Sequence, residues 1–447
     1  MASALATRIA AEHAAAAGSL SADVVSRERR LAAIETLSAE GLPTSRDENW
    51  KYANLRPLEK VKFAAPALAQ AGAGVAAADL PAAIEGYARY VFVDGVFAPG
   101  LSAGSGAKSG IAVRSLREAR AAESAVPGSR DDVATLDRPA ASRDARFALL
   151  NDAFAVDGAD IRVSSGTDCP TCVELVFVAQ VDSQTGASYP RVELHVEPNA
   201  RVGLIERHVS VGSGANFVNS SVRVDIGRGA TVNHYRVQES GAKAVWFDTL
   251  SAVLQQDATY KLHGVNVGAL SARSTINVQL AGRGADAAIS VASLGDKQQI
   301  QDAFVLTEHS APNAKSQQTF RGISAGRARV GFNGMVVVRK DAQGTDSQQS
   351  LRGLLAGPDA EIDVRPQLEI YTDDVRCAHG ATAGKLDDNM LFYLLSRGID
   401  PATAQRLLKW AFLEDVVARI EVPELRRQVE RSLAGQMLEA DALKEFL

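Results

Sequence analysis

A short signature recurs along the middle of the chain, and its spacing is the strongest constraint on the fold. An Asn, Asp or Gly is followed by Ala and then by an alternating polar and apolar run, at intervals of 27 to 30 residues. A period of this size is typical of a solenoid in which each repeat forms one turn. The signature occurs at Asn199-Ala200, Gly229-Ala230, Asp257-Ala258, Gly284-Ala285 and Asn313-Ala314.

The runs between these turns have the pattern of short strands. Segments such as RVELHV, SVRVDI and STINVQL alternate polar and apolar residues and are bounded by small turn residues. SQQT at Ser316 and SQQS at Ser347 repeat 31 residues apart, as stacked polar rungs of successive turns do. The strands are too short and too numerous for a doubly wound sheet. A parallel β-helix fits best, and a β-sandwich is the alternative.

Helical patterns flank this region. The first 40 residues are helical in pattern, and the chain is helical again after Lys385, with Pro401 and Pro423 at first-turn positions. We therefore predict an N-terminal helical and α+β region (1–165), a β-helix core (166–385) and a C-terminal helical domain (386–447).

The predicted helix from Pro401 to Ile420 carries more apolar residues than one buried face requires. Trp410, Leu413, Val417 and Ile420 form a stripe at spacings of three and four residues. The stripe is either a contact for a partner or internal packing.

The composition excludes several classes of protein. A net charge of -5 and a pI near 5.9 give no electrostatic case for nucleic acid as a partner. There is no run of about 18 apolar residues, so no membrane-spanning helix is expected. Three cysteines, an odd number, argue against a disulfide framework and for a reducing compartment, so we expect a cytoplasmic protein.

The chain shows no motif for ATP binding or hydrolysis. A phosphate loop needs four residues between its first Gly and the Gly-Lys pair, followed by Ser or Thr. Gly380 and Gly384 enclose only three residues, and Leu386 follows Lys385. No Ser-His-Asp or paired-carboxylate arrangement can be singled out, so we do not expect an enzyme, and any ATPase must be another chain.

Cys377-Ala378-His379 is the strongest candidate for chemistry. Residues two apart on a strand point to the same face, so this thiol and imidazole would lie side by side. Such ligands suit iron, copper or zinc. Two ligands do not complete a site that needs four. Either the pair is structural, or a partner completes an open and transient site.

A CxxC pair, Cys169 and Cys172, precedes the strand-like run VELVFVAQV. A zinc ribbon needs a second such pair, and a thioredoxin-type motif opens a helix. We therefore expect a turn without a ligand role.

Three stretches resemble the SufB/SufD family of iron–sulfur cluster assembly proteins, over about residues 41 to 420. The DENWKY start and the HGAT motif are typical of the SufD branch rather than the SufB branch. The stretches are GLPTSRDENWKYANLRPL, RGISAGRARVGFNGMVVVRKDAQGTDSQQSLRGLL and PQLEIYTDDVRCAHGATAGKLDDNMLFYLLSRGI.

The resemblance implies a mainly β fold, with a right-handed parallel β-helix between an N-terminal helical and α+β region and a C-terminal helical domain. It implies a heterodimer with SufB through the β-helix and a SufC ATPase on the C-terminal helices, whereas the isolated chain can pair with itself. The candidate residues for the SufC contact are those of the apolar stripe, Trp410, Leu413, Val417 and Ile420. His379, with Cys377 beside it, would help to hold a transient iron–sulfur cluster shared with SufB, and no cofactor would be bound permanently. A purely structural adaptor is the alternative, and a β-helix polysaccharide-active enzyme is disfavoured because no export signal is present.

Overall fold

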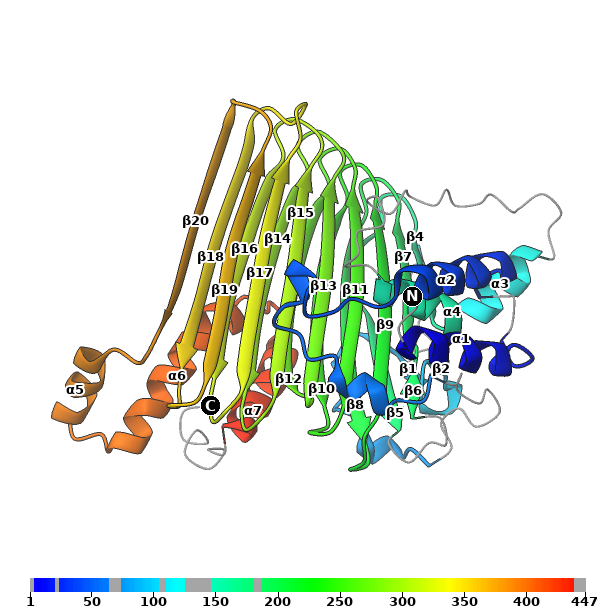
Figure 1. The fold of residues 1–447 in the computed structure, drawn as a ribbon. Coiled ribbons are helices and arrows are strands. Elements are labelled where there is room, and N and C mark those ends of the chain that lie inside the picture. Colours follow the sequence, from blue (N-terminus) through cyan, green and yellow to red (C-terminus); the bar gives the residue numbers. More distant parts are fainter. Residues whose placement is uncertain are drawn as a thin grey trace.

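The solenoid predicted from the repeat is the centre of the molecule (Figure 1). A computed structural model describes residues 4–20, 24–63, 74–103, 110–124, 146–180 and 186–437. In this part of the chain, two sheets face each other and the chain alternates between them, completing about eight turns. The strands are parallel except for the pairs β1–β2 and β3–β4. The prediction of a mainly β protein with a parallel solenoid and helices at both ends is confirmed.

Consecutive strands of the solenoid belong to opposite sheets, which we name sheet A and sheet B. In sheet order, sheet A contains β2 (Val96–Phe97), β1 (Ala88–Val93), β5 (Asp168–Gln180), β8 (Arg201–Val211), β10 (Thr231–Ser240), β12 (Thr259–Gly268), β14 (Asp286–Gly295), β16 (Lys315–Ser324), β18 (Thr345–Leu355) and β20 (Val375–Gly384). Sheet B contains β19 (Glu361–Ile370), β17 (Arg329–Val338), β15 (Ile300–His309), β13 (Ser271–Leu280), β11 (Val245–Leu254), β9 (Phe217–Ile226), β7 (Arg191–Val196), β4 (Ala159–Val163) and β3 (Ile111–Ser115), and β6 (Ala187–Ser188) pairs with β9.

The recurring signature forms the turns that lead into sheet A. Its Asn, Asp or Gly has a φ between 55° and 72° at all five positions, and the Ala that follows is at most 1% exposed. These turns also bond to one another: the Asn199 N–H donates to the Arg228 carbonyl at 2.9 Å, and the Gly229 N–H donates to the Gln256 carbonyl at 2.8 Å. Each turn is therefore registered directly on the next one.

Glycine alternates with Asn or Asp along this column of turns for a steric reason. A Cβ added to Gly229 would lie 2.7 Å from the Asn199 Oδ1 atom of the preceding turn. Gly284 is crowded in the same way by the Asp257 carboxylate. The left-handed φ favours glycine or an Asx residue, and the neighbouring Asx side chain leaves room for glycine alone.

The lumen between the sheets is filled mainly by aliphatic side chains, such as Val232, Leu262 and Ile289. Charged groups in the lumen are paired. The Arg236 guanidinium donates to Glu206 of sheet A at 2.8 Å and to Asp248 of sheet B at 2.7 Å, so it links the two sheets across the lumen. A buried charge is tolerated only with such partners.

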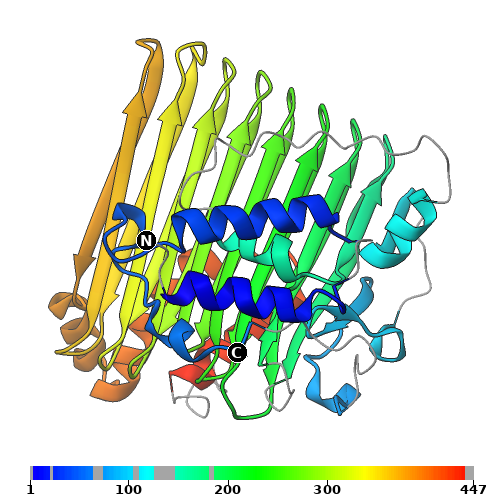
Figure 2. The same cartoon turned by 45° about the vertical axis from the view of Figure 1, so that its right-hand side comes forward.

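Helices cover the outer faces of the solenoid (Figures 1 and 2). The N-terminal helices cross sheet B, where their apolar side chains pack on Phe217 and Phe247, and the last helices lie on sheet A. Pro401 and Pro423 begin two of these last helices, as predicted. No helix of the described ranges is long and apolar enough to cross a membrane. The helices are α1 (Ala4–Ala16), α2 (Arg27–Glu40), α3 (Leu116–Ser124), α4 (Arg146–Phe154), α5 (Asp388–Ser396), α6 (Pro401–Val417) and α7 (Pro423–Gln436).

Trp50 anchors the N-terminal region to sheet B. Its indole is 1% exposed, stacks on Phe147 at 5.1 Å, and lies 4.4 Å from the Arg273 guanidinium of β13. Farther along the sheet, Asn333 of β17 donates to the Asn49 side chain at 3.0 Å, and Arg365 of β19 pairs with Glu48. The DENWKY segment thus crosses sheet B as far as its last strand.

The apolar stripe of α6 is core. Leu413, Val417 and Ile420 are at most 2% exposed and belong to a cluster with apolar side chains of sheet A, and Trp410 is partly buried against it. A contact with a partner needs exposed side chains. The assignment of these three residues to a SufC contact is therefore corrected to the other alternative, internal packing.

We expect Leu413→Glu to lower the free energy of unfolding by about 3 kcal/mol or more, because it places an unpaired charge in the core. The measurement is the thermal and urea unfolding of the purified chain. Phe392→Glu is the matched control, since Phe392 is 72% exposed and should tolerate the same charge. Equal melting temperatures for the two variants would contradict the burial of Leu413.

Candidate functional site at the open end of the solenoid

No described element caps the last turn of the solenoid. β19 and β20 are the final strands of their sheets, and neither has a second neighbouring strand among the described residues. α6 and α7 pack along sheet A, and α5 projects beyond β20 without covering this end. Ile362 and Val364, which continue the apolar lumen, are consequently only partly buried.

Cys377 and His379 lie on β20, the last strand of sheet A. Cys377 is opposite Ser347 of β18, and His379 is opposite Gln349. Ser347 and Gln349 are buried, whereas Gln348 between them is exposed. Because side chains alternate along a strand, Cys377 and His379 point to the same side as the lumen residues, as the sequence predicted.

The two SQQ motifs are stacked polar rungs behind this pair. The hydroxyls of Ser316 and Ser347 are 2.9 Å apart, and the Nε2 atom of His309 lies 2.8 Å from Ser316 Oγ. The Gln349 amide donates to the Gln318 carbonyl oxygen at 2.9 Å. The structure adds buried His309 to the site; the sequence gave no signal for it beyond its place near the turn.

A pocket of about 230 Å³ opens beside His379. Its polar side chains are three amides, one hydroxyl and the imidazole of His379, with no carboxylate, lysine or arginine among them. The lining residues are Gln317, Gln348, Gln349, Ser350, Ala378, His379 and Gly380.

Cys377 is the only unbridged cysteine of the chain and is partly buried against Val336 and Val338. Burial and the charge of Asp346 raise the pKa of its thiol, whereas a hydrogen bond from the Ser347 backbone opposes the rise. The thiol is therefore protonated at neutral pH. A metal bound here must displace that proton, so binding at Cys377 is weaker and more reversible than at an activated thiolate.

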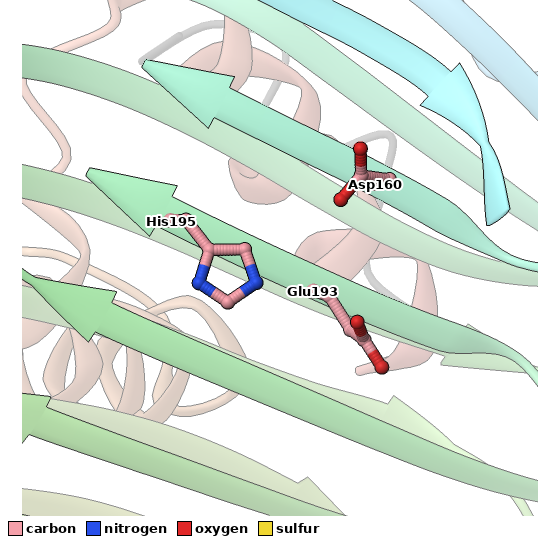
Figure 3. Close-up of side chains that lie close together, drawn as sticks. All are labelled: Asp160, Glu193 and His195. Carbon is pink, nitrogen blue, oxygen red and sulfur yellow. The ribbon is translucent and has the colours of Figure 1, made fainter. Parts of the chain in front are cut away.

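A second group of side chains with metal-like spacing lies at the other end of the solenoid. The carboxylates of Asp160 and Glu193 and the imidazole of His195 approach one another on β4 and β7 (Figure 3). Each carboxylate already binds arginine: Asp160 pairs with Arg114 at 3.1 Å, and Glu193 pairs with Arg191 at 3.1 Å. Although burial opposes ionisation, the arginines hold the pKa of Glu193 below its usual value. This group is a set of ion pairs in which both carboxylates are already neutralised by arginine.

The CxxC pair lies where β5 begins. The pairing of β5 with β8 shifts register between Cys169 and Val173, so the predicted turn is present as a bulge in the strand. The two cysteines form a disulfide bond, which the sequence analysis did not predict. Their Cα atoms are 5.7 Å apart, an ordinary separation for bridged cysteines. One bond over four residues is a local link and no framework.

The largest exposed apolar surface near this end is on α5. Met390, Phe392, Tyr393 and Leu395 are 37% to 72% exposed, and α5 projects beyond β20 (Figure 1). Asp387 caps the helix by accepting hydrogen bonds from the backbone of Asn389 and Met390. The sequence analysis expected a SufC contact somewhere on the C-terminal helices but singled out no residue of this one, although its MLFYLL run was visible.

Comparison with known proteins identifies the family. A model of the SufBD core domain of the SUF system for FeS cluster assembly matches residues 177–412, and a model of the SufBD N-terminal region matches residues 8–175. The first match covers more than half of the chain and includes the open end, α5 and most of α6. The chain belongs to the SufBD family.

Individual SufBD relatives align over much of the chain. The iron–sulfur cluster assembly protein SufD of Escherichia coli is 29% identical over 92% of both chains. A SufBD family protein of Synechocystis sp. is 27% identical over 92% of this chain and 91% of its own. The chloroplastic protein ABCI7 of Arabidopsis thaliana is 29% identical over 56% of this chain and 53% of its own. The resemblance stated from the DENWKY and HGAT motifs is confirmed.

We expect the rate of alkylation of Cys377 by iodoacetamide to increase at a higher pH than the rate for a cysteine in a short unfolded peptide, because the pKa of the Cys377 thiol is raised. The rate is measured against pH without reductant, so that the disulfide-bonded pair stays unreactive. Cys377→Ser gives the background. If the alkylation rate of Cys377 has its inflection at the same pH as that of the peptide, or at a lower pH, the pKa of the thiol is not raised by burial.

Proposed function

We propose that this chain is a component of an iron–sulfur cluster assembly scaffold that pairs with SufB through the open end of its solenoid. The observation that carries the proposal is the position of Cys377 and His379 on an uncapped last turn. The E. coli relative is named for iron–sulfur cluster assembly, and the SufBD family model carries the same description.

Two properties of the open end support a solenoid partner. β19 and β20 each present ten residues of unpaired strand edge, and a long free edge recruits further strands. The half-covered lumen residues Ile362 and Val364 need an apolar cap. A second solenoid such as SufB supplies both, whereas a flat or helical partner supplies only a cap.

In this proposal the nascent cluster is cargo, held between the two chains. His379 and Cys377 provide two ligands, and SufB provides the others. A site shared between chains, with few ligands and a thiol that holds its proton, favours release over permanent binding. We infer no catalytic residue and no resident cofactor, and we place the protein in the cytoplasm with its partners.

We further propose that the SufC ATPase docks on α5. The sequence lacks a phosphate loop, so nucleotide chemistry must come from another chain. With Leu413 and Val417 buried, the large exposed apolar side chains in the described part of the C-terminal helices are those of α5, among them Phe392 and Tyr393. Exposed aromatic clusters of this kind are typical of protein interfaces.

A purely structural adaptor is the competing function, with SufB alone holding the cluster. An adaptor would use the open end and α5 in the same way, but His379 would not be a ligand of the cluster. The two are therefore separated by changing His379 without changing the interface.

We expect His379→Ala to leave folding and assembly with SufB and SufC intact and to lower the iron and acid-labile sulfide of the purified complex. The imidazole is exposed and has no role in core packing. Gln348→Ala is the control, because Gln348 lines the same pocket from the outer side of the strand. Normal cluster content in His379→Ala would favour the adaptor.

We expect Phe392→Glu to abolish co-elution with SufC and to leave pairing with SufB unchanged, since α5 lies outside the strand edges. Size-exclusion chromatography with both partners measures the composition of the complex. Leu31→Glu on α2 is the control, because Leu31 is another large apolar residue on the surface, with 47% exposure. A full complement of SufC on the Phe392→Glu chain would move the docking site elsewhere.

A further inference from the structure

We propose that Gln349 is a positioning residue for His379: once the exposed imidazole rotates toward it, the Gln349 side-chain oxygen accepts one ring N–H and directs the other ring nitrogen to the cargo. This inference rests on the proposed function for the identity of the cargo. Its structural part concerns only which nitrogen of His379 carries the proton. It explains why a glutamine recurs at the same place in two successive rungs, Gln318 and Gln349.

The orientation of both amides follows from carbonyl groups, which can only accept hydrogen bonds. The Gln318 nitrogen faces the Met335 carbonyl at 3.3 Å and the Thr307 hydroxyl at 2.9 Å. The Gln318 oxygen therefore faces the next rung, where it accepts from Gln349.

The same reasoning applies one rung later. The Gln349 nitrogen donates to the Gly334 carbonyl and to the Gln318 oxygen, both at 2.9 Å. An amide turned the other way would set oxygen against oxygen at both contacts. The Gln349 side chain is thereby locked, with its nitrogen toward the body of the solenoid.

The Gln349 oxygen is the last acceptor in this stack of two glutamine amides, and no described donor binds it. Gln349 is 4% exposed, and its Oε1 atom is buried without a hydrogen-bond partner in the described part of the chain. A buried acceptor left unpaired costs about 1–3 kcal/mol. A donor on the next rung would remove this cost.

His379 is the residue on the next rung. It lies directly opposite Gln349 in the β18–β20 register, and both line the pocket of about 230 Å³. In the structure the exposed imidazole does not make this hydrogen bond. Because neighbouring strands are about 4.8 Å apart, a rotation of the His379 side chain brings its N–H within reach of the Gln349 oxygen. Gln317 and Gln348, the other amides of the pocket, are exposed on the opposite face of their strands.

The consequence is a fixed tautomer. A neutral imidazole has one N–H and one lone pair, and a hydrogen bond to one nitrogen decides that the other binds a metal. Histidine ligands of metals are commonly held this way by a second residue. An exposed His379 without such a partner would rotate and exchange its proton between both nitrogens.

The test is nitrogen NMR of the chain alone, labelled with ¹⁵N-histidine, at a pH above which the His379 signals no longer change. His379→Ala identifies the His379 signals among those of the seven histidines. We expect one tautomer of His379 in the wild-type chain and a mixture in Gln349→Met, which keeps the shape but lacks the acceptor. Gln348→Met is the control and should match the wild type.

A conservative variant separates positioning from a structural role. If Gln349→Met does not fold, Gln349→Asn keeps the amide but withdraws it by one methylene and should also give the mixture. A mixed tautomer in the wild type, or a single tautomer in either folded Met or Asn variant, would overturn the inference.

The two proposals fail in different ways. If Gln349 positions His379, Gln349→Met should also lower the iron of the complex, because loss of such an outer partner weakens metal binding about 10- to 100-fold. Normal iron in His379→Ala would defeat the cargo role and leave the tautomer result standing. Reduced iron in His379→Ala, together with unchanged ring signals in Gln349→Met, would defeat only the role of Gln349.

Discussion

The backbone hydrogen bonds between successive turns are the interaction on which the rest of this structure depends. Each left-handed residue of the repeated signature donates to a carbonyl of the next turn, and the alanine after it fills the corner. Because this contact is made by the backbone, it sets the register of all ten residues of the following strand. The vertical alignment of Ser316, Ser347 and Cys377 follows from it.

Side chains add specificity to this backbone column. Asn199 and Gly229 fit together because one side chain occupies the space that the other lacks, so adjacent turns are not interchangeable. Arg236 then ties the two sheets to each other through Glu206 and Asp248. Such buried ion pairs contribute little net stability, and removal of one partner leaves an uncompensated charge. They fix which strands face each other across the lumen.

The sequence predicted those features that depend on spacing along one chain. The turn period identified the solenoid, and the two-residue separation of Cys377 and His379 placed both on one face. The sequence did not predict which apolar side chains are buried by neighbouring elements and which are exposed. Leu413 and Phe392 belong to equally apolar helical runs, and only the position of each helix against sheet A decides that one is core and the other exposed. The orientation of the Gln349 amide is likewise invisible in sequence, since it follows from carbonyls of other strands.

The column of turns continues to the final rung, where the Gly344 N–H still donates to the Asp374 carbonyl at 2.7 Å. In the proposed pairing, a partner solenoid would extend this column through the same backbone hydrogen bonds that join successive turns of the chain. A partner strand offset by one residue would turn every inward side chain outward. Such an interface would therefore depend on strand register, and it would tolerate changes of side chain more readily than a single inserted residue.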